Sequence, residues 1–310
     1  MEHETPISGG IAPPREDRGF RLEEWRFVEG PGPCLWAPPE LSPLSYLPSF
    51  RRLTPPQQVR YNQLFALGVA EQFIWFESAV LGRILGGVLR DLRGSSLVEE
   101  IERLLADENR HSEMFWRLLQ AAAPDLYPER RFQFLKPGLL QGLFIRVTAA
   151  HPRLNPAWIW MAVFFEERTL DYSRHHAETT AELHPGFALA HRLHLQDEVR
   201  HVPMDLRLLT HLYDPEPSWK KWWARVVVTK VLRTLASPRL ISRRILERMG
   251  REFPNLERDR VRQLLSELRG LRWNRDFLEM GFGESAVPRF RELLARYPEM
   301  RGVSACFGRE

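Results

Sequence analysis

A five-residue phrase occurs twice in this chain. The first copy is Asp107-Glu108-Asn109-Arg110-His111, and the second, 90 residues later, is Asp197-Glu198-Val199-Arg200-His201. The same 90-residue step leads from Glu77 to Glu167, so a single glutamate precedes each phrase by 31 residues. Positions i and i+3 share one face of a helix, so the Glu and His of each phrase can reach one metal ion. Two units of Glu followed by Glu-x-x-His are the ligand set of a carboxylate-bridged two-metal centre in a four-helix bundle.

The alternative interpretation of a Glu-x-x-His pair is an ordinary solvated helix face. Here, however, each glutamate shares a helical stripe with apolar residues, for example Glu108 with Leu104 and Phe115. Acidic side chains are rarely buried without a partner, because an unpaired buried charge is costly. Four buried glutamates at repeating intervals therefore favour bound cations.

A third histidine extends the ligand set. His194 lies four residues before Glu198 and seven before His201, so the three project from one helix face and a third His could bind one metal ion, the alternative being an ordinary bundle histidine. His191, one turn further back, is interpreted as an ordinary bundle histidine. Glu71, Glu113 and Glu166 are nearby competitors, and the 90-residue register favours Glu167 over Glu166.

The aspartates that precede the two repeated glutamates predict an outer layer of the site. Metal-binding histidines usually donate their other ring N–H to a carboxylate. Asp107 and Asp197 are expected to accept these hydrogen bonds across the bundle, the alternative being exposed helix charge.

The donor types limit the metal and its chemistry. Mixed carboxylate and imidazole ligands suit iron, with manganese as a substitute, and disfavour copper(I) or a thiolate zinc site. Four glutamates balance the charge of two divalent irons, and an oxidised pair needs an additional oxygen-derived anion. This arrangement suits activation of O2.

Composition indicates a cytoplasmic protein. The 310 residues are 44% hydrophobic, enough for one large core or two small ones. The two cysteines, Cys34 and Cys306, cannot form a disulfide framework and are expected to be free thiols. The sequence has no 18-residue apolar run, which predicts no transmembrane helix, and the polar, acidic N-terminus is unlike a signal peptide.

The chain divides into three predicted regions, all α-helical where they are ordered. Residues 1–50 are a Pro-rich arm, with disorder expected for the first 20 or so, and they wrap the core through Trp25, Phe27, Trp36 and Tyr46. Residues 51–214 are the metal-binding bundle, and residues 215–310 are a basic helical region packed on it. Breakers at Gly94-Ser95-Ser96 and His184-Pro185-Gly186 mark the two turns between paired ligand helices. The expected helices span about 54–93, 96–123, 137–150, 156–182, 186–214, 255–270 and 286–297, with a break at Ser237-Pro238 inside the basic stretch.

Positive charge is concentrated in the last region. The net charge of the whole chain is +4, whereas residues 215–310 carry 21 Lys/Arg and 12 Asp/Glu. The stretch 217–248 holds nine Lys/Arg and one acid, Glu247. It is either a solvated helix face or a docking surface for an acidic carrier protein or a membrane. No recognised motif supports nucleic-acid binding.

The order of these residues resembles the diiron N-oxygenases of the p-aminobenzoate N-oxygenase family. The most specific match is His191-x2-His194-x2-Asp197-Glu198-x-Arg200-His201, and the resemblance covers about residues 55–214. It implies a ferritin-like four-helix bundle with additional C-terminal helices and an extended N-terminal arm. The iron ligands it implies are Glu77, Glu108, His111, Glu167, His194, Glu198 and His201.

The resemblance also implies a reaction. An external electron donor reduces the two irons, O2 binds as a peroxo-diiron(III) species, and an oxygen atom passes to the nitrogen of a small-molecule amine. The product is a hydroxylamine, and further rounds give nitroso or nitro compounds. We expect a homodimer.

Two other functions are compatible with the residues. The first is C-hydroxylation or desaturation of a carrier-bound acyl group, which the basic stretch would serve. The second is non-catalytic iron storage or a structural metal site, which the roughly 100 additional C-terminal residues disfavour because storage cages are built from shorter chains.

Overall fold

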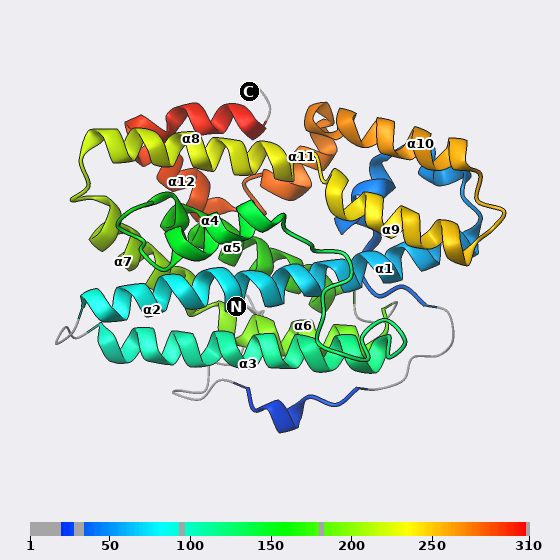
Figure 1. Cartoon of the computed structure of the whole chain (residues 1–310), viewed down its shortest axis with the longest axis horizontal. Coiled ribbons are helices and arrows are strands. Elements are labelled where there is room, and N and C mark those ends of the chain that lie inside the picture. The colour runs from blue at the N-terminus through cyan, green and yellow to red at the C-terminus, as the bar shows by residue number, and fades with distance from the viewer. Residues whose placement is uncertain (1–19, 28–33, 93–96, 180–182, 308–310) are drawn as a thin grey trace, which may run out of the picture.

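Four helical stretches form the centre of the molecule in the computed structural model, which describes residues 20–27, 34–92, 97–179 and 183–307 (Figure 1). The first is a continuous helix made of α1 (Pro55–Ile74), a π-helical segment (Trp75–Leu81) and α2 (Gly82–Asp91). The others are α3 (Val98–Ala122), α5 (Ala157–Glu178) and the pair α6 (Pro185–Glu198) and α7 (His201–Tyr213). The first helix packs against α3, and α5 packs against α6 and α7, while α3 and α6 join the two halves.

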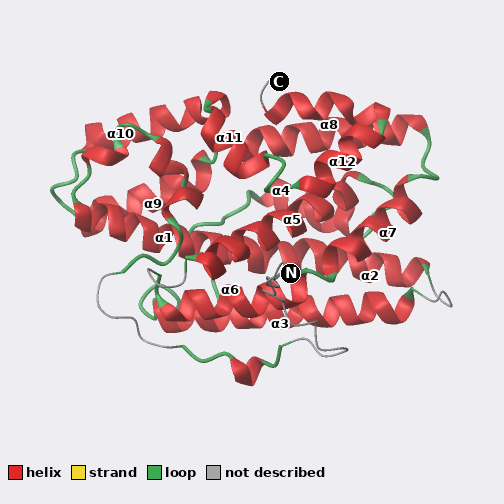
Figure 2. Cartoon of the chain, turned by 180° about the vertical axis from the view of Figure 1, so that it is seen from behind, coloured by secondary structure: helices red, strands yellow, loops and turns green. Residues whose placement is uncertain are grey.

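The remaining helices surround this bundle. Their bounds are α4 Leu139–Ala149, α8 Ser218–Leu235, α9 Arg239–Glu252, α10 Arg258–Glu267, α11 Arg275–Phe282 and α12 Pro288–Arg296. Helices α8 and α12 pack on α5, and α9 packs on α1. Apart from one bridge between Leu35 and Leu183, the described residues contain no β-structure, and helices dominate Figure 2. The prediction of an all-α bundle with added C-terminal helices is confirmed.

The helix boundaries follow local signals in the sequence. Gln57 accepts the N–H of Thr54 at 3.0 Å, which satisfies one free donor at the start of α1, and Pro55 occupies the first helical position. At the start of α6, Nδ1 of His184 accepts the N–H of Gly186. The predicted turn at Gly94-Ser95-Ser96, the predicted helix start at Ser96 and the first 19 residues lie outside the described residues.

Two features differ from the sequence prediction. The fourth bundle helix is interrupted at Val199 and Arg200. Pro203 explains the break, because a proline has no N–H to donate to the carbonyl of Val199 four residues earlier. Helix α11 was not expected, although Asn274 caps it by accepting the N–H of Phe277.

The helix Pro55–Asp91 is long and apolar enough to cross a membrane by length and composition, and no other described helix is. However, 78% of its most apolar window is buried inside the protein. Burial of this kind is typical of the central helix of a bundle.

Two buried side chains hold the arm on the bundle: Asn62 of α1, which makes three hydrogen bonds to it, and His176 of α5, which contacts the carbonyl of Trp36 at 3.3 Å. Oδ1 of Asn62 in α1 accepts the N–H groups of Trp36 (2.8 Å) and Ala37 (3.1 Å), and its Nδ2 donates to the carbonyl of Ala37 (2.7 Å). Trp25 and Trp36 are buried against the helices.

We predict that Asn62→Ala lowers the free energy of unfolding by about 2–3 kcal/mol, because it leaves buried backbone donors and an acceptor unpaired. Urea denaturation measures the change. Asn155→Ala is the matched control, because Asn155 is equally buried but its side-chain atoms have no hydrogen-bond partner. Equal losses in the two variants would contradict this role for Asn62.

Candidate metal centre

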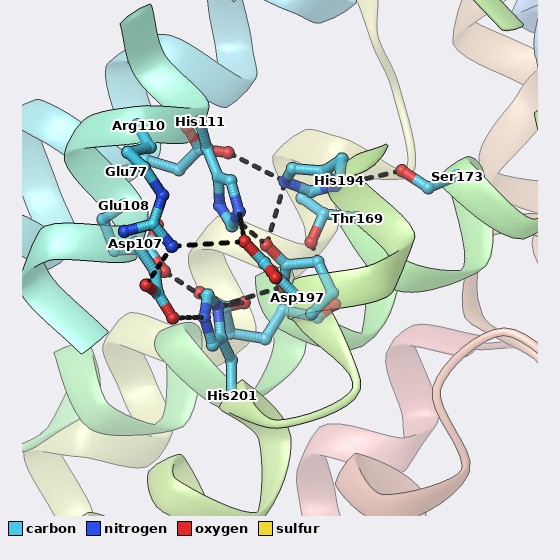
Figure 3. Close-up of polar contacts among 12 residues, drawn as sticks. Glu77, Asp107, Glu108, Arg110, His111, Thr169, Ser173, His194, Asp197 and His201 are labelled. Atoms are coloured by element: carbon cyan, nitrogen blue, oxygen red, sulfur yellow. Dashed lines mark hydrogen bonds and ion pairs between the residues drawn. The ribbon is translucent and has the colours of Figure 1, made fainter. Parts of the chain in front are cut away.

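Seven buried side chains converge in the middle of the bundle, each at most 2% exposed. Figure 3 labels five of them, Glu77, Glu108, His111, His194 and His201. Two overlapping groups could each hold a metal ion: Glu77, His111, His194 and Glu198 form one, and Glu108, His111, Glu198 and His201 form the other. His194 Nε2 lies 2.9 Å from a Glu198 oxygen and 3.2 Å from a Glu77 oxygen. His201 Nδ1 lies 2.9 Å from Glu108. The seventh side chain, Glu166, lies 3.7 Å from His201 Nδ1.

The structure thus brings together six of the seven predicted ligands and replaces the other. Glu167 is directed away from the cluster: its two carboxylate oxygens accept the N–H groups of Arg289 (2.8 Å) and Phe290 (2.7 Å) at the start of α12. The neighbouring Glu166 faces the cluster instead. The prediction of Glu167 is therefore wrong in its placement.

Helical phase explains this difference. Glu77 lies in the π-helical segment, whereas Glu166 lies in the regular helix α5. Because a π-helix turns through a smaller angle per residue than an α-helix, the same number of residues does not bring a side chain to the same side of the helix in both repeats. A signal for Glu166 was present in the sequence. Glu166, Thr169, Ser173 and His176 follow the helical spacing of three and four, and all four are buried.

The other competitors have separate roles. Glu71 is fully buried, and its carboxylate accepts the N–H groups of Gln133, Phe134 and Leu135 and the hydroxyl of Tyr127, so it fixes the segment after α3. Glu113 pairs with Arg117 and Arg130 near the surface.

An outer layer orients two of the histidines. His111 Nε2 lies 3.3 Å from Asp197 and His201 Nε2 lies 3.4 Å from Asp107, each pair joining the two halves of the bundle. A carboxylate can only accept, so Nε2 carries the proton in each ring and Nδ1 is left to face the cluster. These are the cross-bundle pairs predicted from the repeated Asp-Glu phrase.

The two arginines of the repeated phrase complete this layer. Arg110 pairs with Asp107 and Asp197, and Arg200 pairs with the same two carboxylates. Phe20 from the arm covers the layer, stacked on His111 with ring centroids 5.8 Å apart.

His194, the third histidine, has a different hydrogen-bond partner. Its Nδ1 lies 3.1 Å from the hydroxyl of Ser173, a neutral partner, and it turns Nε2 toward the cluster. Ser173 also lies 3.2 Å from His191 Nδ1, so His191 contacts this partner and not the cluster. Sequence reasoning missed Ser173, and it also missed Asp205, which is buried one turn after His201 with an unpaired oxygen.

The pKa values of these side chains show that burying the charged cluster is unfavourable without cations. Burial, with the charges of Glu198 and Glu108, raises the pKa of Glu166 well above its usual value. Burial opposes ionisation of Glu198 too, but the charges on His194 and His201 hold its pKa well below the usual range. Burial likewise disfavours the charged form of His111, yet its contacts with Asp197 and Glu198 raise its pKa to about 10. In the metal-free chain, protonated histidines thus provide the positive charge that metal ions would otherwise supply.

The donor set fits a pair of metal ions. Both oxygens of Glu108, one oxygen each of Glu166 and Glu198, and Nδ1 of both His111 and His201 are buried; some lie within ion-pair distance of one another, but none makes a well-aligned hydrogen bond. Buried polar atoms are normally paired, so six such atoms at one point indicate an additional binding partner. Four carboxylates and three imidazoles are donors suited to iron or manganese.

Fold and site together define a class: an all-α bundle with a buried glutamate and histidine cluster of the dinuclear metal type. The chain belongs to the p-aminobenzoate N-oxygenase AurF family, whose model matches residues 29–268. No curated protein matches the chain significantly. The family is that of diiron N-oxygenases, and it confirms the resemblance found in the sequence.

We predict that Glu166→Gln weakens binding at one of the two metal positions by about tenfold or more, because an amide is a poor substitute for a carboxylate ligand. Glu167→Gln is the matched control. It should leave metal content unchanged and lower only stability, because Glu167 caps α12. Titration with Fe2+ without O2, with metal analysis, measures both. If Glu167→Gln lost metal and Glu166→Gln did not, Glu167 and not Glu166 would be the metal ligand.

A second prediction concerns pH. The pKa of His111, raised from its ordinary value to about 10, means that its charged form stabilises the metal-free fold. This contribution is fully present below the ordinary pKa, near pH 6.5, and is lost as the pH rises through about 10. Metal-free protein should therefore lose stability over this range.

At pH 7, binding of Fe2+ should release protons, because a histidine ligand must be neutral. Calorimetry in buffers of different ionisation enthalpy measures the release. His211→Gln, at an exposed position, is the control and should release the same number. Binding without proton release would contradict a protonated His111 in the metal-free state.

Proposed function

We propose that this protein is a diiron oxygenase that transfers an oxygen atom from O2 to the nitrogen of a small-molecule amine. The observation that supports it is the convergence of seven buried carboxylate and imidazole side chains in a chain whose family is that of p-aminobenzoate N-oxygenases. Glu77, Glu108, His111, Glu166, His194, Glu198 and His201 would hold the two irons. A bound iron pair supplies O2 activation with electrons from an external donor.

The chain itself controls the surroundings of this chemistry. His111 and His201 are fixed in rotation and in tautomer by Asp197 and Asp107, so both keep Nδ1 available for a metal. Glu198 lies between the two groups of ligands and contacts all three histidines, a position that suits a bridging carboxylate. Phe73 and Phe115 pack against His194 and help to exclude water.

The overall reaction balances. One oxygen atom of O2 forms the new N–O bond and the other leaves as water, which consumes two electrons and two protons and converts a primary amine into a hydroxylamine. Repetition gives the nitroso and nitro levels. The amine must lie within contact distance of the iron pair, and the protein provides this positioning.

We predict about two irons per chain after anaerobic reconstitution, and about one labelled oxygen atom in the first product when the reduced protein meets 18O2 and p-aminobenzoate in a single turnover. Metal analysis and mass spectrometry measure the two quantities. Glu108→Ala is expected to abolish product. An acyl group on a carrier protein, offered in parallel, tests the alternative of C-hydroxylation or desaturation.

Two results would contradict the proposal. Fewer than about 1.5 irons per chain would exclude a dinuclear centre. The second result is a centre of two irons that O2 oxidises without forming a labelled amine product. If such a protein also took up many further irons per chain, its function would be iron storage instead.

A further inference from the structure

Helix α4 exposes nearly all of its apolar side chains. Only Ile145 and Ala149 are buried among the described side chains of this helix. Its exposed apolar residues are Leu139 (89% exposed), Leu140 (81%), Leu143, Phe144 and Val147. Apolar residues scattered singly on a surface are normal, but a contiguous group usually marks a contact with another molecule or a membrane.

Helix α8 continues this surface with tryptophans and cations. Trp219, Trp222 and Trp223 are each at least 40% exposed. Lys230 and Arg233 lie on the same helix face as these tryptophans, because they follow at spacings of three and four residues. Ala224, Val228 and Leu232 are buried on the opposite face. Cations and indole rings therefore point outward together.

The two helices form one surface, which we name the α4–α8 surface and define by residues 139–147 and 219–233. The ammonium group of Lys220 in α8 donates to the carbonyl of Arg153 at 2.8 Å, in the loop that follows α4. Leu154 in this loop is 62% exposed and extends the apolar area. Both helices can be followed in Figure 1, with α8 above α4.

The charge on this surface has one sign. Neither Leu139–Ala149 nor Ser218–Leu235 contains an aspartate or glutamate. Asp91 pairs with Arg153 and Glu216 with Lys220 at the edge, whereas Arg146, Arg225 and Lys230 form no ion pair with any residue the structure describes. Arg225, Lys230 and Arg233 line a groove of about 590 Å³ together with Val226, Thr229, Thr234 and, from the C-terminal 3₁₀-helical segment, Gly302.

We propose that the α4–α8 surface binds an anionic lipid membrane. Leucine and phenylalanine on α4 would enter the boundary between headgroups and acyl chains, and the tryptophans of α8 would lie at that boundary, where indole rings are favoured. The groove between Arg225 and Arg233 would receive lipid phosphate groups. Peripheral binding of this kind needs no membrane-spanning helix.

Charge argues against a second copy of this chain as the occupant. A two-fold interface would press two copies of this patch together, and neither copy contains an acidic side chain to pair with the cations of α8. An acidic protein could pair with the cations of α8. Charge pairing alone, however, does not explain why the leucines of α4 are the most exposed residues of this surface. A membrane surface accounts for both.

Sedimentation with vesicles of phosphatidylcholine alone, and of phosphatidylcholine containing about 30% phosphatidylglycerol, tests the proposal. The iron-reconstituted full-length protein should bind the anionic vesicles at least about tenfold more tightly, and the difference should shrink as salt is raised. Leu140→Glu with Phe144→Glu, and separately Trp222→Ala with Trp223→Ala, should each weaken binding by about tenfold or more. These residues are exposed, so circular dichroism and iron content should stay unchanged.

Trp273→Ala is the matched control, because Trp273 is 77% exposed in the 3₁₀-helical segment Leu268–Trp273 between α10 and α11 and should not affect sedimentation. Three results would overturn the proposal. The first is wild-type protein that stays in solution with both vesicles. The second is a dimer, seen by light scattering, that Leu140→Glu converts to monomer. The third is soluble polyglutamate that binds as tightly as the vesicles and competes with them.

Discussion

The rest of the structure depends on a concentration of negative charge inside a protein core. Glu77, Glu108, Glu166 and Glu198 are each at most 2% exposed and are drawn from four different helical stretches. An isolated buried carboxylate is so unfavourable that it normally takes up a proton, and the raised pKa of Glu166 shows this tendency. Four carboxylates can all be ionised there only if positive charge is present at the centre. Histidine protons supply it in the metal-free chain, and metal ions of the proposed centre would supply more.

The two repeats of the sequence give this centre an approximate symmetry, but the third histidine breaks it. His111 and His201 face the cluster through Nδ1 and have charged aspartate partners, whereas His194 uses Nε2 and has the neutral hydroxyl of Ser173. A carboxylate partner makes an imidazole a stronger donor than a hydroxyl does. The two candidate metal positions are thus inequivalent in their surroundings, because Nδ1 of His194 has a hydroxyl partner where the outward ring nitrogens of His111 and His201 have carboxylates.

The sequence could predict most of the fold because its signals are local. Thr54-Pro55 and His184-Pro185-Gly186 mark helix starts, and the spacing of Glu108 and His111 implies a buried helix face. Glu167 was predicted wrongly because counting along a chain assumes the same helical rotation in both halves. The π-helical segment at Glu77 violates that assumption. The arm residue Phe20 over His111 could not be predicted at all, because no periodic pattern links it to the site.

These irregularities fall where the site requires them. Regular α-helices at fixed packing distance offer few directions for a side chain, and seven side chains must meet at nearly one point. A π-helical segment rotates Glu77 relative to the rest of its helix, and a break between Glu198 and His201 lets these two residues approach from different helix ends. In α3, where Glu108 and His111 lie on an unbroken helix, no such adjustment is present. Two of the four helical stretches therefore depart from ideal geometry next to the candidate ligands, and the packing of the large apolar core on either side holds those departures in place.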